Sequence, residues 1–258
     1  LSTHITTLAN SDPNLRSLFS SGVALSNYHG VTHSSQPNYS TSLPLPETFS
    51  LQGQIHPQHG HLLQDGRRPF GSKGLTWKTY QEDMPSVCYR GSSSQSLYHR
   101  KHNPFVSFDN IFKNATRGKN VVPRRNCRQT SKPSDGHDTT VAYASKWSTG
   151  FLALLLSNPT FNNDTLVVLT FDEADDYFDS CNHVLGLLLG SAVHNIKNTV
   201  DSTFYTQYSL ISTVTANWGL DNLGRNDINK PVSNVFSFVA NLPGYQNVVV
   251  TNPPRLNF

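Results

Sequence analysis

The stretch that most constrains the fold is an apolar run at residues 165–171, Thr-Leu-Val-Val-Leu-Thr-Phe, followed at once by Asp172 and Glu173. An unbroken apolar run of strand length predicts a strand buried on both faces, as in the centre of a parallel sheet. Ligands of such sheets gather at the carboxyl ends of the strands. Adjacent carboxylates repel each other there unless a cation compensates. Asp172 and Glu173 therefore predict a cation site, with an acidic surface loop as the alternative.

Other segments alternate between strand and helix patterns. Apolar runs at residues 23–25 and 184–190 predict two more buried strands. Helix signals cover residues 12–22, with Pro in the first turn and Gly at the end, and a further helix opens near residue 204 and ends near 220. Strands alternating with helices predict an α/β fold, a three-layer sandwich with a mostly parallel central sheet. A chain of 258 residues is taken as one domain, 1–258.

The clearest helix is expected over residues 140–157. Its apolar positions recur at helical spacing and share one face: Val141, Ala144, Trp147, Phe151, Leu154 and Leu155. We expect this face to pack into the core, and Trp147 to be a core residue rather than a platform for a substrate. Asp138 or Thr139 could cap the start of this helix.

Composition excludes several classes of protein. Charged residues make up 14% and aromatic residues 10% of the chain, which is a globular composition. The formal charge is only +3, no long Lys/Arg block occurs, and no apolar run reaches membrane-spanning length. We expect neither nucleic-acid binding nor a membrane span, and a solvated loop for the basic patch at Arg124, Arg125 and Arg128. Oligomeric state and the pairing of the three cysteines stay open.

A serine-rich turn follows the first apolar run. Residues 27–39 read NYHGVTHSSQPNY, so Ser34 and Ser35 stand just before a Gln-Pro-Asn turn. A serine where a strand gives way to a helix start can be exposed and activated as a nucleophile, and a helix start also offers backbone N–H groups to a phosphate. An ordinary Ser-rich loop is the alternative.

Five segments together resemble one family. Residues 32–39, THSSQPNY, resemble the THPSxPNY signature of the fungal and bacterial phosphoesterase family, with Ser34 in place of the usual proline. The family's SWxxYQENMP, YxRKHNPF, NDGHDTT and LTFDE motifs are matched at residues 76–85, 98–105, 135–140 and 169–173. The family contains acid phosphatases and phosphatidylcholine-type phospholipases C, and it has the alkaline-phosphatase-like fold.

The resemblance implies roles for individual residues. Ser35 would be the nucleophile, and Ser35, Asp172 and Glu173 would hold a divalent metal ion of undetermined identity. His33, Asn38, Lys101 and His102 would bind the phosphoryl group, His137 would protonate the leaving alkoxide, and Asp138 would orient His137 or bind the ion. Without the resemblance, Lys101 and His102 read as a basic turn before a proline.

Some segments depart from the family. Its FYTHYS motif carries Gln207 in place of histidine, and an amide is neither a cationic phosphate partner nor a strong metal ligand. No Glu-Asn pair occurs at residues 1–10, so we expect the family's first strand to be lacking. Residues 43–74 match poorly, and the histidines there, His56, His59 and His61, favour a surface loop over a metal site.

The sequence therefore predicts an acid phosphatase, a phosphoric-monoester hydrolase acting on small phosphate esters, secreted or in the cell wall. Sequons at Asn38, Asn114 and Asn163 support secretion weakly, and Leu1 would fit a mature chain without its signal peptide. A glycan on Asn38 would fall inside the proposed site, so that sequon is expected to be unused. A phospholipase C-type phosphodiesterase and a catalytically weakened secreted binding protein on the same fold are the alternatives.

Overall fold

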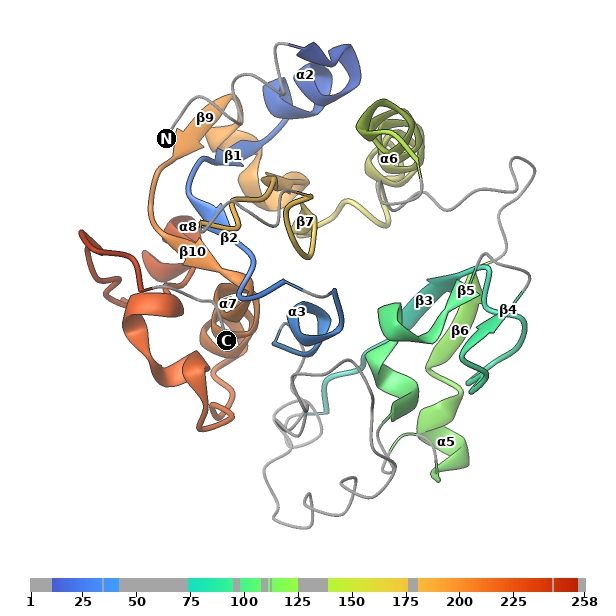
Figure 1. Ribbon diagram of the computed structural model, residues 1–258. Coiled ribbons are helices and arrows are strands. Elements are labelled where there is room, and N and C mark those ends of the chain that lie inside the picture. Colours follow the sequence, from blue (N-terminus) through green and yellow to red (C-terminus); the bar gives the residue numbers. More distant parts are fainter. Residues whose placement is uncertain are drawn as a thin grey trace.

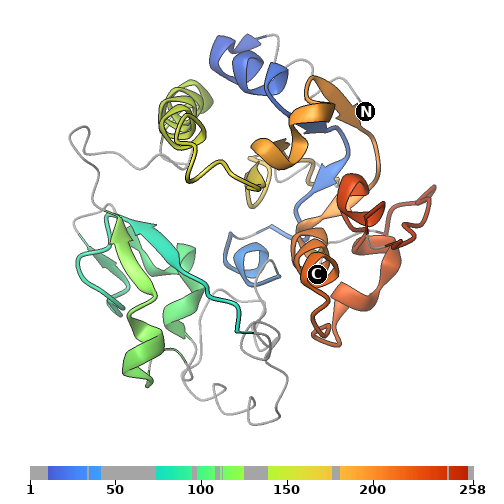
Figure 2. The same ribbon diagram turned by 180° about the vertical axis from the view of Figure 1, so that it is seen from behind.

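The computed structural model describes residues 11–33, 35–41, 74–94, 98–107, 111, 113–124, 139–175, 181–242 and 244–254. Its elements form two groups (Figure 1), and the view from behind shows the same separation (Figure 2). The smaller group contains β3 Thr79–Glu82, β4 Ser93–Ser94, β5 Tyr98–His99, η3 Arg100–His102, η4 Pro104–Ser107, α5 Ala115–Gly118 and β6 Val121–Arg124.

The main body contains the remaining elements. In chain order they are α2 Pro13–Ser20, β1 Val23–Leu25, β2 Tyr28–His29, α3 Ser35–Thr41, α6 Val141–Leu156, β7 Val167–Thr170, β8 Gly186–Leu189, η5 Ser191–Ile196, β9 Thr199–Asp201, β10 Tyr205–Thr206, α7 Gln207–Trp218, η6 Asn226–Ile228, η7 Lys230–Val232 and α8 Ser237–Ala240. Helices α2, α6 and α7 and strands β1, β7 and β8 confirm the predicted segments. No helix in these ranges is long and apolar enough to cross a membrane.

The principal sheet has the strand order β7-β8-β1-β9. Strand β8 runs antiparallel to both neighbours, and only the β1–β9 pairing in this sheet is parallel. Two-stranded pairs complete the described sheets: β10–β2 and β3–β6 are parallel, and β4–β5 is antiparallel. The α/β class is confirmed, whereas a mostly parallel sheet is not what the described strands form.

The prediction that residues 165–171 form a central parallel strand was wrong. Strand β7 lies at the edge of the four-stranded sheet and runs antiparallel to β8. All four residues of β8 are buried, whereas all four of β7 are only half-buried. An apolar run reports burial against neighbouring side chains, and it carries no information about strand direction or place in the sheet.

The buried face of α6 also differs from its prediction. Thr140 caps the helix, and the buried residues are Ala144, Ser145 and Leu152, while Leu154 is 75% exposed. The reason is a polar contact with α2, because Asp12 caps α2 and its carboxylate also accepts a hydrogen bond from Ser145 Oγ at 2.8 Å. This contact turns Ser145 inward and the Leu154 side outward.

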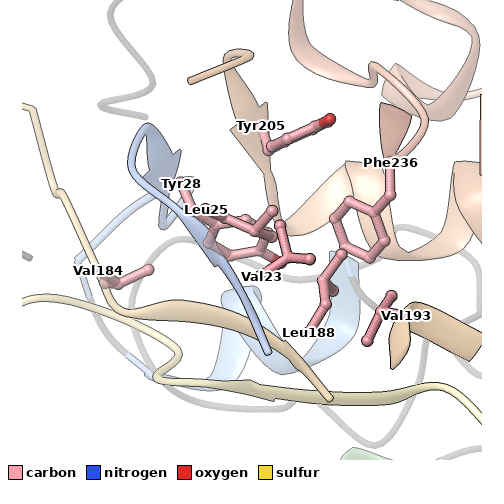
Figure 3. Close-up of a cluster of buried hydrophobic side chains, with 8 residues drawn as sticks. All are labelled: Val23, Leu25, Tyr28, Val184, Leu188, Val193, Tyr205 and Phe236. Carbon is pink, nitrogen blue, oxygen red and sulfur yellow. The ribbon is translucent and has the colours of Figure 1, made fainter. Parts of the chain in front are cut away.

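The core of the main body lies between the strands and the C-terminal segment. Its buried side chains come mainly from β1, β2, β8 and β10 and include Phe236, which packs edge-on against Tyr205 with ring centroids 5.2 Å apart (Figure 3). The smaller group has its own cluster, formed by Met84, Tyr98, Val106, Ile111 and Val121. These two cores give α3 a fixed position between α7 and the smaller group, which both views show (Figure 1, Figure 2).

Arg124 ends β6 and connects the smaller group to α6. Its guanidinium carbon lies 4.5 Å from the ring centroid of Trp147 and 3.8 Å from that of Phe151. The expected solvated position of Arg124 was therefore wrong, because a planar guanidinium stacks on aromatic faces. Trp147 is half-buried and belongs to none of the described core clusters, contrary to its predicted place in the core.

Candidate active site

Ser35 is the first residue of α3, directly after the loop that follows β2. Its Oγ donates a hydrogen bond to Oε1 of Glu173 at 2.9 Å. Glu173 follows the end of β7, so the structure brings the serine turn and the acidic strand end together, although they lie far apart in the sequence. A hydroxyl held by a carboxylate is the arrangement in which a general base accepts the proton of a nucleophile.

His33 contacts the same carboxylate from the other side. Its Nδ1 lies 3.4 Å from Oε2 of Glu173, and the two side chains are only 15% and 11% exposed. A protonated imidazole at this distance makes an ion pair with Glu173. The site thus contains a hydroxyl, an imidazole and a carboxylate in direct contact.

Asp172 lies beside Ser35 and has an unusual environment. Burial raises the pKa of its carboxyl group, and the Glu173 charge adds to the rise, while the nearby Ser35 hydroxyl opposes it. The Oδ2 atom is buried and has no hydrogen-bond partner within the described part of the chain. A buried carboxylate oxygen without a partner is costly unless it is protonated or faces a cation.

The loop that leads to Ser35 approaches the Asp172 backbone very closely. A Cβ on Gly30 would lie 2.6 Å from Asn182 Nδ2 and 2.8 Å from the Asp172 carbonyl oxygen, so only glycine fits here. Asn182 then joins the two segments, since its Nδ2 donates to the Thr32 carbonyl at 2.9 Å and its Oδ1 accepts from the Ala174 N–H at 2.8 Å.

Gln207 supports the strand end from α7. Its Nε2 donates to the Phe171 carbonyl at 2.9 Å and lies 3.3 Å from the Asp172 carbonyl oxygen. Its Oε1 accepts from the Tyr28 hydroxyl at 3.1 Å, and the residue is 2% exposed. The residue that departs from the family motif is therefore part of the frame that holds Asp172 in place.

Asn38 is bound to the backbone of the serine loop. Its Oδ1 accepts from the Val31 N–H at 2.8 Å, its Nδ2 donates to the Thr32 carbonyl at 2.7 Å, and it is 1% exposed. These bonds fix the loop against α3. The contact of Asn38 with phosphoryl oxygens stays a prediction. A glycan on the Asn38 amide would disrupt these bonds, and the expectation that this sequon is unused stays a prediction.

The predicted basic residues lie on the next element. Helix η3, which contains Lys101 and His102, packs against α3. The ring of His102 lies 5.8 Å from that of Tyr39, and Lys101 is exposed. His137 and Asp138 lie outside the described residues, so their predicted roles stay predictions.

Comparison of the sequence with known protein families identifies the family of this chain. A family model described as the Phosphoesterase family matches residues 8–221, most of the chain. The chain belongs to the phosphoesterase family.

Several relatives of the chain are named as phosphatases. The chain is 36% identical to an acid phosphatase of Aspergillus fumigatus, over 96% of this chain and 60% of the relative. It is 36% identical to a phosphate-repressible acid phosphatase of Penicillium chrysogenum, over 92% and 61%, respectively. A phosphatidylinositol-3-phosphatase of Mycobacterium tuberculosis is 28% identical, over 88% of this chain and 76% of that protein. The phosphoesterase spans about 60% of the length of these fungal relatives.

The donors at this phosphoesterase site suit a hard divalent cation. Ser35, Asp172 and Glu173 offer only oxygen atoms, which Mg²⁺ and Ca²⁺ prefer, and the unpartnered Oδ2 of Asp172 is the kind of atom that a cation satisfies. Within the described ranges, no group of three or more His, Cys, Asp and Glu side chains has the arrangement of a metal site. Two carboxylates and a hydroxyl supply fewer than the roughly six oxygen ligands that such an ion needs, so they fit an ion that keeps several water ligands.

Sequence reasoning named the candidate reacting groups of this site but not the residues that support them. Gly30 and Asn182 were not predicted, because their roles depend on contacts between segments about 150 residues apart. Gln207 was noticed only as a departure from the family motif. A glycine directly after a strand and a buried amide near an acidic strand end are the signals that could have pointed to them.

Proposed function

We propose that this chain is a phosphoric-monoester hydrolase of the acid phosphatase type, with Ser35 as the nucleophile. The observation that carries the proposal is the 2.9 Å hydrogen bond from Ser35 Oγ to Glu173, made beside a second, buried carboxylate. The names of the fungal relatives support the monoester specificity. We also propose that the described elements belong to an alkaline-phosphatase-like, three-layer fold.

The chain's own groups account for the first half of the reaction. Glu173 accepts the proton of the Ser35 hydroxyl as Oγ attacks phosphorus. The bond from phosphorus to the ester oxygen breaks, and the leaving alkoxide takes a proton from His137. His33 stays in contact with Glu173 and balances its charge. Lys101 and His102 neutralise charge on the transferred phosphoryl group.

The second half regenerates the enzyme. Water attacks the phosphoserine and gives a proton to His137, the bond between Oγ and phosphorus breaks, Ser35 recovers its proton from Glu173, and inorganic phosphate leaves. A divalent ion held by Ser35, Asp172 and Glu173 would supply positive charge that lowers the pKa of the hydroxyl and stabilises the phosphoryl oxygens.

Secretion or cell-wall attachment is part of the proposal. The sequons at Asn114 and Asn163 lie on exposed residues, and Asn114 caps α5 through its side-chain oxygen. Both can accept a glycan without disturbing the core, unlike Asn38.

The test is to trap the intermediate. A labelled monoester is mixed with the protein, the reaction is quenched in acid, and the peptides are mapped. We expect the label on Ser35. Label on another residue, or none during measurable turnover, would contradict the serine mechanism. Parallel assays with an aryl monoester, an aryl diester and phosphatidylcholine separate the phosphatase from a phospholipase C-type enzyme, and no release from any of them would favour the binding protein.

A further inference from the structure

A cavity of about 340 Å³ borders Asp172 on the side of α6. Its wall is formed by side chains from α2, α3, α6, α7 and the end of β7, and includes Tyr39, Val141, Trp147, Leu169, Phe171 and Asp172. This volume lies within the range of about 300–1,000 Å³ that is typical of small-molecule pockets. The cavity lies entirely among described residues.

The wall is mostly apolar, and several of its apolar side chains are not fully buried. Tyr39, Trp147 and Phe171 are half-buried, and Val141 is 41% exposed at the first residue of α6. An apolar ligand that covers solvent-exposed apolar surface inside a concave site removes that surface from water, which favours binding. The stacking of Arg124 on Trp147 fixes one part of the wall before any ligand arrives.

The cavity adjoins the proposed reaction site at Asp172. Asp172 borders the cavity and also lies beside the Ser35 hydroxyl. Tyr39 lies about one turn after Ser35 on the same helix, and residues four apart share a helix face, so one ligand can contact both. A group attached to a phosphorus atom at Ser35 therefore reaches the cavity past Asp172.

Charge determines which part of a substrate enters. The residues that line the cavity include one carboxyl group, Asp172, and no basic residue, whereas Lys101 and His102, which are proposed to bind the phosphoryl group, lie on η3. The phosphoryl group thus stays on the Ser35 side, and the uncharged part of the ester enters the cavity. Three aromatic side chains in one wall favour a flat ring, because offset and edge-on contacts between rings add to simple burial.

We propose that this cavity binds the aromatic leaving group of aryl phosphate monoesters, so that Tyr39, Val141, Trp147 and Phe171 determine substrate preference. The inference rests on the proposed phosphatase function. It assigns Trp147 to substrate recognition, a role that the amphipathic pattern of α6 did not suggest.

Two matched variants test the cavity. Val141→Asp puts a charge on its wall, and Ala142→Asp puts the same charge on the adjacent, exposed residue that does not line it. Both positions are in the first turn of α6, where an acidic residue is favourable, so both variants should fold. We measure the ratio of kcat/KM for 2-naphthyl phosphate to that for glycerol 3-phosphate. It should fall about tenfold in V141D, the size of effect expected in an apolar pocket, and stay at the wild-type value in A142D.

A binding measurement separates failure of this inference from failure of the proposed function. Calorimetry with 2-naphthol needs no catalysis, and we expect binding to wild type and A142D and loss of binding in V141D. If the chain hydrolyses no ester but binds 2-naphthol in this pattern, the cavity is an aromatic site and the phosphatase proposal fails. If it hydrolyses both esters with the same ratio in all three proteins, and 2-naphthol does not bind, the cavity inference is wrong and the phosphatase proposal stands.

Discussion

Ser35 is the residue on which the proposed chemistry depends, and the register of the serine turn can be tested directly. Ser35→Ala should lower the kcat for monoesters by several orders of magnitude, because loss of a nucleophile removes the covalent route. Ser34→Ala should keep most of the activity, since Ser35, and not its neighbour, has the motif's spacing to Pro37 and Asn38. Steady-state kinetics of the two variants test this assignment. If Ser34→Ala is the inactive variant, the nucleophile is Ser34 and the alignment of the motif is off by one residue.

Burial of Asp172 destabilises the folded chain when its carboxyl group is charged. Its pKa is raised above the ordinary 3.8 by burial and by Glu173, so its neutral form favours folding. The stability that it contributes is present below that ordinary value and is lost as the pH rises through the raised pKa. In chelator at neutral pH, Asp172→Asn should therefore melt at a higher temperature than wild type while losing activity.

The advantage of Asp172→Asn should disappear below about pH 3.8, where the wild-type carboxyl is also neutral in both states. Added Mg²⁺ should raise the melting temperature of wild type and not of the variant, and chelator should lower the activity of wild type. Equal melting curves of the two proteins at neutral pH in chelator would mean that the buried carboxylate of Asp172 does not destabilise the fold.

At the scale of elements, the close approach of the serine loop to the end of β7 can be tested with paired glycine substitutions. Gly30→Ala would place a Cβ 2.8 Å from the Asp172 carbonyl, so it should destabilise the protein and push Ser35 from Glu173, with lower kcat. Gly150→Ala, in the exposed interior of α6, meets nothing within 4 Å and should stabilise the protein by about 0.5–1 kcal/mol with unchanged activity. Denaturant unfolding and kinetics of both variants check this, and an unaffected Gly30 variant would show that the two segments are not in contact.

Local signals predicted which elements form better than how they pack. The caps at Asp12 and Thr140 and the apolar run of β8 lie within a few residues of the elements they define, so the sequence contains what is needed. The edge position of β7 and the rotation of α6 follow from β8 and from Asp12, which lie elsewhere in the chain. Periodicity along one segment cannot show such partners.

At the scale of the whole molecule, short motifs named the candidate reacting groups before the structure was known, whereas no motif named the residues that hold them together. Glu173 and Ser35 come from two motifs and meet in the structure at 2.9 Å. The amides of Asn182 and Gln207 that hold these segments bond to backbone carbonyls of other segments, which any residue could offer. Such bonds become visible only when the chain is folded.

Contacts between the two groups of elements include two that lie near the candidate site. Helix η3 packs on α3, with His102 facing Tyr39, and Arg124 stacks on Trp147 and Phe151 of α6. The smaller group carries Lys101 and His102, so their position relative to Ser35 depends on both contacts. Loss of one contact should loosen this group without unfolding either core, since each group has a hydrophobic cluster of its own.

Arg124→Met tests this coupling, because it keeps the apolar stem and removes the cation. A cation–π contact contributes about 0.5–2 kcal/mol, so amide exchange in β3 and β6 should become several-fold faster while exchange in β1 and β8 stays as in wild type. The KM for a monoester should rise, because the basic residues on η3 are held less firmly. Lys119→Met removes an equal charge from an exposed site in the smaller group and serves as the control. If both variants show the same exchange and the same KM, the effect is one of net charge, and the stacked arginine does not position the smaller group.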